Sequence, residues 1–166
     1  MNDNYIMLNG RRIDLTDEQV LQLTERPIHC NAFERVLRGK SYYCTNRYGD
    51  VGVLTETEDM SDNRVFDAAN YFNDKQFANQ VALHQLLYRK LLKFAYDNGF
   101  EDTAEWDCHN RHYHIIYSFN DKDFDFDGND TFKRQGTVYF SSEEGALQAI
   151  SGVVIPFMKE HPEFVW

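Results

Sequence analysis

The amino-acid sequence predicts an α+β fold, in which antiparallel β-hairpins and meanders pack against a long central helix and a C-terminal helix. Three observations predict it. Asn9-Gly10 lies between the segments 5–8 and 11–15, as in a two-residue hairpin turn. Residues 73–98 carry apolar side chains at helical spacing. Residues 123–127 alternate Asp with Phe, which is typical of a strand with one solvated face.

Length and composition favour one domain spanning 1–166. Hydrophobic residues make up 42% of the 166 positions, so the chain can bury a core without disulfides or metals. Cys30, Cys44 and Cys108 form no C-x-x-C pair, so neither a disulfide framework nor a zinc ribbon is predicted. The sequence has no signal-peptide pattern and no apolar run near the roughly 18 residues of a membrane span. We therefore expect a cytoplasmic protein that does not bind membranes.

A hairpin followed by a helix is predicted at 5–25. Asn9-Gly10 accepts the positive φ angles of the turn. Thr16 and Gln19 have the spacing of a capping box, in which each side chain bonds the backbone N–H of the other residue. The helix is expected to end near Glu25, before Pro27.

Two further units are predicted at 41–98 and 112–160. The first is expected to contain strands at 41–45 and 51–54, an acidic loop at 56–63, a short strand within 65–72, and a helix from Asn73 to Asn98-Gly99. The second is expected to contain strands at 113–119, 123–127 and 136–140, and a helix capped by Ser141 and kinked at Pro156. In each unit an aromatic pair precedes the helix, as in two copies of one pattern. Convergence on a common strand-then-helix arrangement explains the likeness equally well.

The long predicted helix has a wide apolar face. One stripe at spacings of four and three consists of Phe77, Val81, His84, Tyr88, Leu91 and Ala95. A second stripe beside it consists of Leu83, Leu87 and Phe94. A face this wide predicts a helix packed deeply against a sheet.

Negative charge dominates the chemistry of the sequence. With 27 acidic and 17 basic residues the net charge is −10, so duplex DNA is repelled and a basic protein partner is attracted. Two acidic groups are candidate partner-binding surfaces. They are Glu56, Glu58, Asp59 and Asp62 in the predicted loop, and Asp121, Asp123, Asp125, Asp127 and Asp130 near the predicted hairpin. An aspartate row along one strand face either guards the strand edge or meets a basic partner that relieves its self-repulsion.

No complete catalytic motif is present, and we expect neither a catalytic residue nor a cofactor. The alternative is a metal-dependent enzyme that uses Cys108, His109, His112 and His114, since thiolate and imidazole are zinc ligands. These residues have no second ligand pair at an interpretable spacing, so surface or structural histidines are the favoured interpretation. Phe164 and Trp166 near the C-terminus either pack on the core or dock on another chain, as a phage structural or assembly protein would require.

Several segments resemble a set of small phage and prophage proteins of Gram-positive bacteria. They are 7–10 with 13–20, 33–36 with 39–43, 70–72, 136–140 and 156–166. The resemblance provides no catalytic residue. By analogy of setting, it implies an anti-defence protein of the host bacterial cytoplasm, of the anti-CRISPR kind. Such a protein would bind a CRISPR effector nuclease of the Cas9 type and block nucleic-acid binding or cleavage through acidic surfaces that imitate DNA.

Overall fold

The structure of the chain is a computed structural model, and it describes residues 5–8, 10–16, 19–20, 31–100, 106 and 108–166. The predicted α+β class is confirmed, because the described elements are antiparallel hairpins and helices. No helix in these ranges is long and apolar enough to cross a bilayer.

The N-terminal hairpin forms as the Asn-Gly turn predicts. β1 (Tyr5–Leu8) pairs antiparallel with β2 (Arg11–Asp14), and Gly10 in the turn has a φ of 78°. The capping box that follows is also confirmed. The Thr16 N–H donates to Gln19 Oε1 at 3.0 Å, and the Gln19 N–H donates to Thr16 Oγ1 at 3.2 Å. Most of the helix predicted after it lies outside the described residues.

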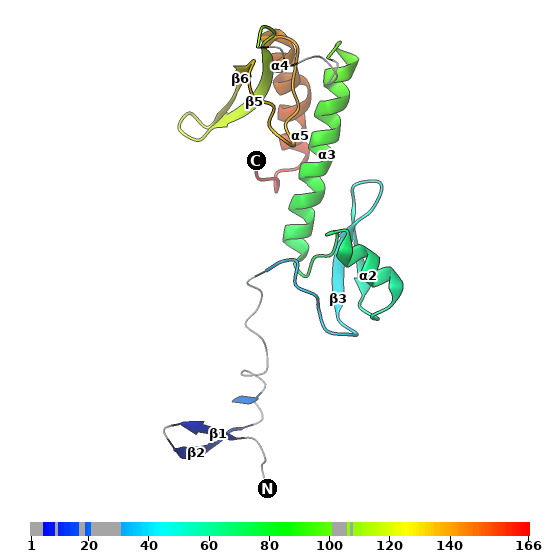
Figure 1. The fold of residues 1–166 in the computed structure, drawn as a ribbon, viewed down its shortest axis with the longest axis vertical. Coiled ribbons are helices and arrows are strands. Elements are labelled where there is room, and N and C mark those ends of the chain that lie inside the picture. The colour runs from blue at the N-terminus through cyan, green and yellow to red at the C-terminus, as the bar shows by residue number, and fades with distance from the viewer. Residues whose placement is uncertain (1–4, 9, 17–18, 21–30, 101–105, 107) are drawn as a thin grey trace.

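The first unit lies beside the N-terminal half of the long helix α3 (Lys75–Asp97) (Figure 1). β3 (Ser41–Thr45) and β4 (Val51–Thr55) form the predicted antiparallel hairpin. On the side of β3 away from β4, Tyr43 exchanges two backbone hydrogen bonds with Phe72, at 2.7 and 2.8 Å. The strand prediction within 65–72 was wrong, because residues 65–67 are helical and only Phe72 forms a bridge.

The acidic segment predicted as a loop contains the start of a helix, α2 (Met60–Asp67). The Asp59 side chain accepts hydrogen bonds from the N–H groups of Ser61 at 2.7 Å and Asp62 at 3.0 Å. The Asp62 side chain in turn accepts one from the Asp59 N–H at 3.4 Å. The loop prediction was wrong because Asp59 and Asp62 form a reciprocal helix cap, although their polar composition is also typical of a loop.

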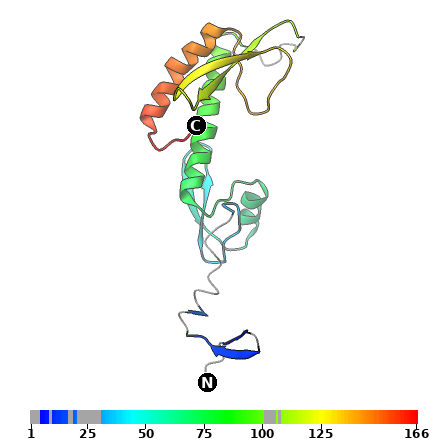
Figure 2. The ribbon, with the colours of Figure 1, turned by 90° about the vertical axis from the view of Figure 1, so that its left-hand side faces the viewer.

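α3 (Lys75–Asp97) is the central helix of the molecule (Figure 2). Its cap is Asp74, which accepts a hydrogen bond from the Phe77 N–H at 2.9 Å, so the helix begins one residue beyond the predicted Asn73 cap. Gly99 follows the helix end with a φ of 84°, as the Asn-Gly pair predicts.

The apolar face of α3 is divided differently from the prediction. Phe77 and Tyr88 of the first stripe are 38% and 39% exposed, whereas Leu83 and Leu87 of the second are buried. The core forms around the C-terminal half of α3. Its buried members are Leu83, Leu87, Leu91, Ala95, Phe100, Val138, Tyr139, Phe140, Ala146, Ala149, Val154, Phe157 and Phe164.

The second unit repeats the arrangement of the first. β5 (His112–Ser118) and β6 (Asp123–Asn129) form an antiparallel hairpin. Tyr113 on β5 exchanges two backbone hydrogen bonds with Phe140, at 2.9 and 2.7 Å. The segment 136–140, predicted as a strand, contributes only this bridge. In both units the bridge is followed by a capped helix, so β4 and β6 occupy equivalent outer positions.

The C-terminal helical segment consists of α4 (Glu143–Ala149), the π-helix η1 (Ile150–Val154) and α5 (Ile155–Glu160). Ser142, one residue after the predicted cap, accepts a hydrogen bond from the Gly145 N–H at 3.1 Å. Pro156 lies in the first turn of α5, where a missing N–H is tolerated. The kink was predicted at this proline, but the irregularity of the helix is the π-helical turn η1, which precedes the proline.

Gly49→Ala is expected to lower the free energy of unfolding by about 1–2 kcal/mol, because a left-handed backbone is unfavourable for a residue with a Cβ. Gly49 has a φ of 96°, and an added Cβ would stand 3.0 Å from Nη2 of Arg89 on α3. Urea unfolding measures the change. Gly52→Ala is the control, because its Cβ would meet Cys44 only at 3.8 and 4.0 Å. Equal losses in the two variants would contradict the argument.

Candidate functional site

The aspartate row lies on the outer face of β6. Phe124 and Phe126 pack against the core, and the aspartates that alternate with them point outward. All five predicted aspartates of this region are exposed: Asp121, Asp123, Asp125, Asp127 and Asp130. The alternation of the sequence therefore places the row as predicted.

The row also caps the outer edge of β6. In the antiparallel alternation of the hairpin, the N–H groups of Phe124, Phe126 and Gly128 point away from β5. Each of them donates to the carboxylate of the preceding aspartate at 2.8 Å. The Gly128 carbonyl accepts a hydrogen bond from Nη2 of Arg111 at 3.0 Å. Edge protection, one of the two interpretations of the row, thus has a hydrogen-bonding basis.

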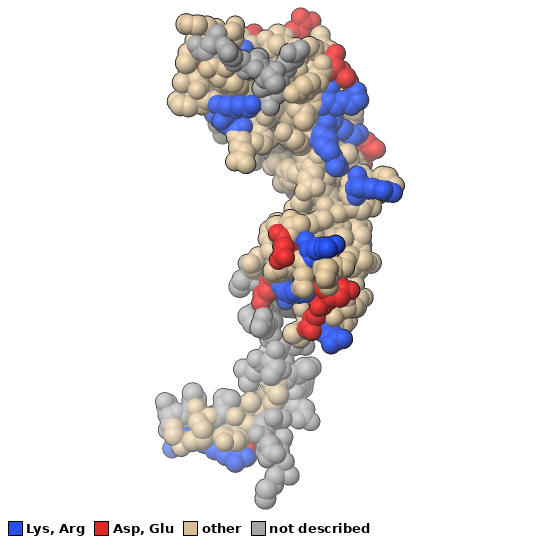
Figure 3. All heavy atoms as spheres, turned by 45° about the vertical axis from the view of Figure 1, so that its right-hand side comes forward, with Lys and Arg blue, Asp and Glu red and all other residues tan. Residues whose placement is uncertain are grey.

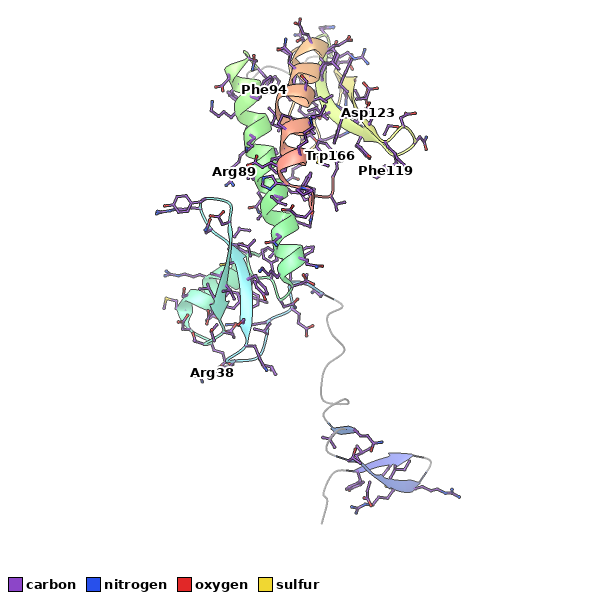
Figure 4. The ribbon with its side chains drawn as sticks, turned by 180° about the vertical axis from the view of Figure 1, so that it is seen from behind. Arg38, Arg89, Phe94, Phe119, Asp123 and Trp166 are labelled. Carbon is purple, nitrogen blue, oxygen red and sulfur yellow. The ribbon has the colours of Figure 1, made fainter. Side chains whose placement is uncertain are left out.

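The charge of the row is not neutralised within the described part of the chain, where no lysine or arginine forms an ion pair with it. Lysine and arginine side chains gather instead over α3 (Figure 3). Figure 4 shows Arg89 on the opposite side of α3 from Asp123. Phe119, near the tip of the hairpin, is 79% exposed. The hairpin therefore presents an aromatic side chain beside unpaired negative charge.

The second predicted acidic surface is not one surface. Glu58 and Asp59 are exposed, but Glu56 and Asp62 are 1% and 5% exposed and point into the first unit. The prediction of one acidic surface was wrong, because each of the two buried carboxylates accepts hydrogen bonds from donors of its own chain. Sequence reasoning missed Arg35, the cation that pairs with Glu56, because the two residues are 21 positions apart and no local pattern connects them.

Glu56 accepts four hydrogen bonds, the number that a carboxylate can accommodate. Arg35 donates two of them, from Nε at 2.8 Å and from Nη2 at 2.9 Å. The Tyr71 hydroxyl donates at 2.8 Å and the Glu58 N–H at 2.7 Å. The hydrogen bonds from Arg35 lower the pKa of Glu56 below its ordinary value, and burial raises the pKa of Tyr71 to about 12.

Asp62 closes the same network on the other side of a tyrosine stack. It accepts hydrogen bonds from the Thr57 N–H at 2.7 Å, the Thr57 hydroxyl at 2.8 Å and the Tyr42 hydroxyl at 2.7 Å. The rings of Tyr42 and Tyr71 stack with centroids 4.0 Å apart. These hydrogen bonds hold the pKa of Asp62 well below its usual range, and the one from the Thr57 N–H has the largest effect. The network is structural, because it is buried and satisfied.

Stability is expected to fall as the pH is lowered below about 4, where carboxyl groups of the unfolded chain take up protons. The folded pKa values of Glu56 and Asp62 are depressed, so the unfolded state binds protons first and is favoured by acid. Urea unfolding across this pH range measures the slope. Asp62→Asn should make the slope shallower, and Asp67→Asn, at an exposed position, should not. An unchanged slope in Asp62→Asn would contradict the assignment.

The Cys/His cluster proposed as an alternative site is split by the fold. Cys108 is exposed, whereas His112 and His114 are 4% and 2% exposed. His112 stacks on Trp106 with centroids 4.2 Å apart, and Nε2 of His114 lies 3.1 Å from Nη1 of Arg134. Burial and the Arg134 charge lower the pKa of His114. In the ranges that the structure describes, no three His, Cys, Asp or Glu side chains are placed to hold a metal.

An apolar cavity of about 700 Å³ lies between α3, β5 and the C-terminal tail. Its lining includes Leu87, Leu91, Ile115, Val138, Phe140, Phe164 and Trp166. Gln80 fastens the tail beside it, donating to the Glu163 carbonyl at 2.7 Å and accepting from the Val165 N–H at 3.0 Å. Phe164 is buried, and Trp166 packs on Phe124 with centroids 4.9 Å apart. Both aromatic residues of the tail therefore contact the core of their own chain.

Comparison of the chain with protein-family models, with curated proteins and with solved structures gives no match.

Proposed function

We propose that the chain is a binding protein that uses the aspartate row of β6 to occupy a basic surface of another protein. One observation carries the proposal: no lysine or arginine of the described chain forms an ion pair with the exposed carboxylates of the row. Like charges on one face repel each other, and a cationic surface would relieve that repulsion. The edge-capping hydrogen bonds hold the carboxylates in place, so little ordering is needed on binding.

The partner class follows from the charge pattern. Negative charges repeated along a strand suit a groove that normally holds a nucleic-acid backbone, and a nuclease channel of the Cas9 type is such a groove. The exposed Phe119 beside the row offers an apolar anchor of the kind that dominates interface energetics. We therefore propose inhibition of a host defence nuclease, by exclusion of its nucleic acid, as the activity of the protein.

The deciding experiment is a DNA-cleavage assay with a guide-loaded Cas9-type nuclease, in which the wild-type chain and row variants are titrated. Inhibition that depends on the row supports the proposal. Full cleavage at saturating wild-type protein would rule out this nuclease class as the target. If the immobilised chain retains no protein from a bacterial lysate, the proposed binding function itself is contradicted.

A further inference from the structure

β4 has an outer edge that the described chain leaves unpaired. The Asp50 carbonyl and the Glu56 N–H each bond toward the β3 side, at 2.9 Å, which fixes the alternation between them. The backbone groups of Val51, Val53 and Thr55 therefore point outward. Among the described residues, no hydrogen bond from outside the β3–β4 pair reaches these groups.

The equivalent outer edge of β6, in contrast, has its backbone groups hydrogen-bonded by side chains. There, three aspartate side chains cap the outward N–H groups, and Arg111 caps one carbonyl. β4 carries no charged residue at all between Val51 and Thr55. Val53 is 62% exposed and Leu54 is 43% exposed. An uncharged strand edge with unpaired backbone groups is a template for another strand, and proteins protect the edges that are not used in this way.

We propose that two copies of the chain associate by antiparallel pairing of β4 with β4 across a two-fold axis at Val53. In this register Val53 lies opposite Val53 of the second copy, Val51 lies opposite Thr55, and Gly52 lies opposite Leu54. The outward N–H and C=O groups of each strand then bond those of the other, and β3–β4 becomes half of a continuous four-stranded sheet. The proposal concerns a surface other than the aspartate row and does not depend on the proposed function.

The edge is complementary to itself, which is why the occupant is a second copy. An isologous interface requires that each residue accept its symmetry mate, and no pair between Val51 and Thr55 brings like charges together. Asp50, just outside the strand, comes opposite Glu56, whose carboxylate is buried and bonded by Arg35. The Leu54 side chain faces Gly52, which has no side chain to obstruct it. The same pairing of β6 would place aspartates against aspartates. The net charge of −10 on each copy opposes association, so we expect a weak dimer that salt strengthens.

The test is sedimentation equilibrium of the purified full chain, from about 0.1 M to about 1 M salt, over which the Debye length falls from roughly 10 to 3 Å. We expect a reversible monomer–dimer equilibrium that shifts toward dimer with protein concentration and with salt. Val53→Lys places two ammonium groups opposite each other at the axis and should raise the dimer Kd by at least about tenfold. Leu147→Lys, at a 50% exposed position on α4, makes the same change in net charge and should leave the dimer intact.

A second measurement covers the outcome in which Val53→Lys fails to fold. Val53→Cys, treated with a short bismaleimide, should give a covalent dimer well above the unsubstituted chain, and Leu147→Cys should not. A monomer at every concentration and salt overturns the proposal. So does a dimer that Val53→Lys leaves unchanged, or equal cross-linking of the two cysteine variants. Because no partner protein is used, these results are independent of the nuclease assay.

Discussion

Replacing Asp123, Asp125 and Asp127 together with asparagine is expected to weaken binding to the cationic partner by about a hundredfold. Each exposed charge pair contributes up to about 1 kcal/mol, and roughly 1.4 kcal/mol corresponds to a factor of ten. Asparagine keeps a side-chain oxygen that accepts the next N–H, so the edge of β6 stays capped while three charges are removed. The concentration for half-maximal inhibition in the cleavage assay measures the loss.

The control for this experiment uses the acidic residues that end three helices. Asp67, Asp97 and Glu160 are exposed last residues of α2, α3 and α5. Their replacement by Asn, Asn and Gln changes the net charge by the same amount, and the helix dipole tolerates the loss of an acid at a C-terminus. The control should inhibit like the wild type. Equal weakening of both triple variants would show that net charge, and not the row, determines binding.

Glu56→Ala is expected to lower the free energy of unfolding by about 3 kcal/mol, the scale found when one member of a buried ion pair is removed. The change leaves the Arg35 guanidinium and the Tyr71 hydroxyl without their shared acceptor. It also opens a space at the buried hydroxyl end of Tyr71. Urea unfolding of the wild type and the variant measures the difference.

Glu58→Ala is the control for the buried carboxylate. Glu58 lies two residues away, carries the same charge and is exposed, so its loss should change the free energy of unfolding by less than about 0.5 kcal/mol. If both variants lose the same amount of stability, the hydrogen bonds of Glu56 contribute little to the fold. The comparison also shows how differently a buried acid and an exposed acid two residues apart contribute to the free energy of unfolding.

The sequence predicted several local elements in which short-range chemistry decides the backbone. Asn9-Gly10 specified the first turn, Thr16 and Gln19 specified a capping box, and the long apolar period specified α3 to within two residues. One local prediction failed, because the Asp59 and Asp62 cap of α2 has the composition of a loop. The strand predictions that failed concern pairing over distance. The strand expected at 136–140 is a single bridge between Phe140 and Tyr113, a pairing between distant parts of the chain that no local pattern specifies.

The candidate site shows the same division. Strict alternation of Asp and Phe in β6 determined by itself that the aspartates share one solvated face, because successive strand residues point to opposite sides. Whether an acid of the 56–62 segment faces water or Arg35 was decided only by tertiary structure. Composition gives the number of charges, but the free energy of a carboxylate depends on which donors the fold brings within hydrogen-bonding distance.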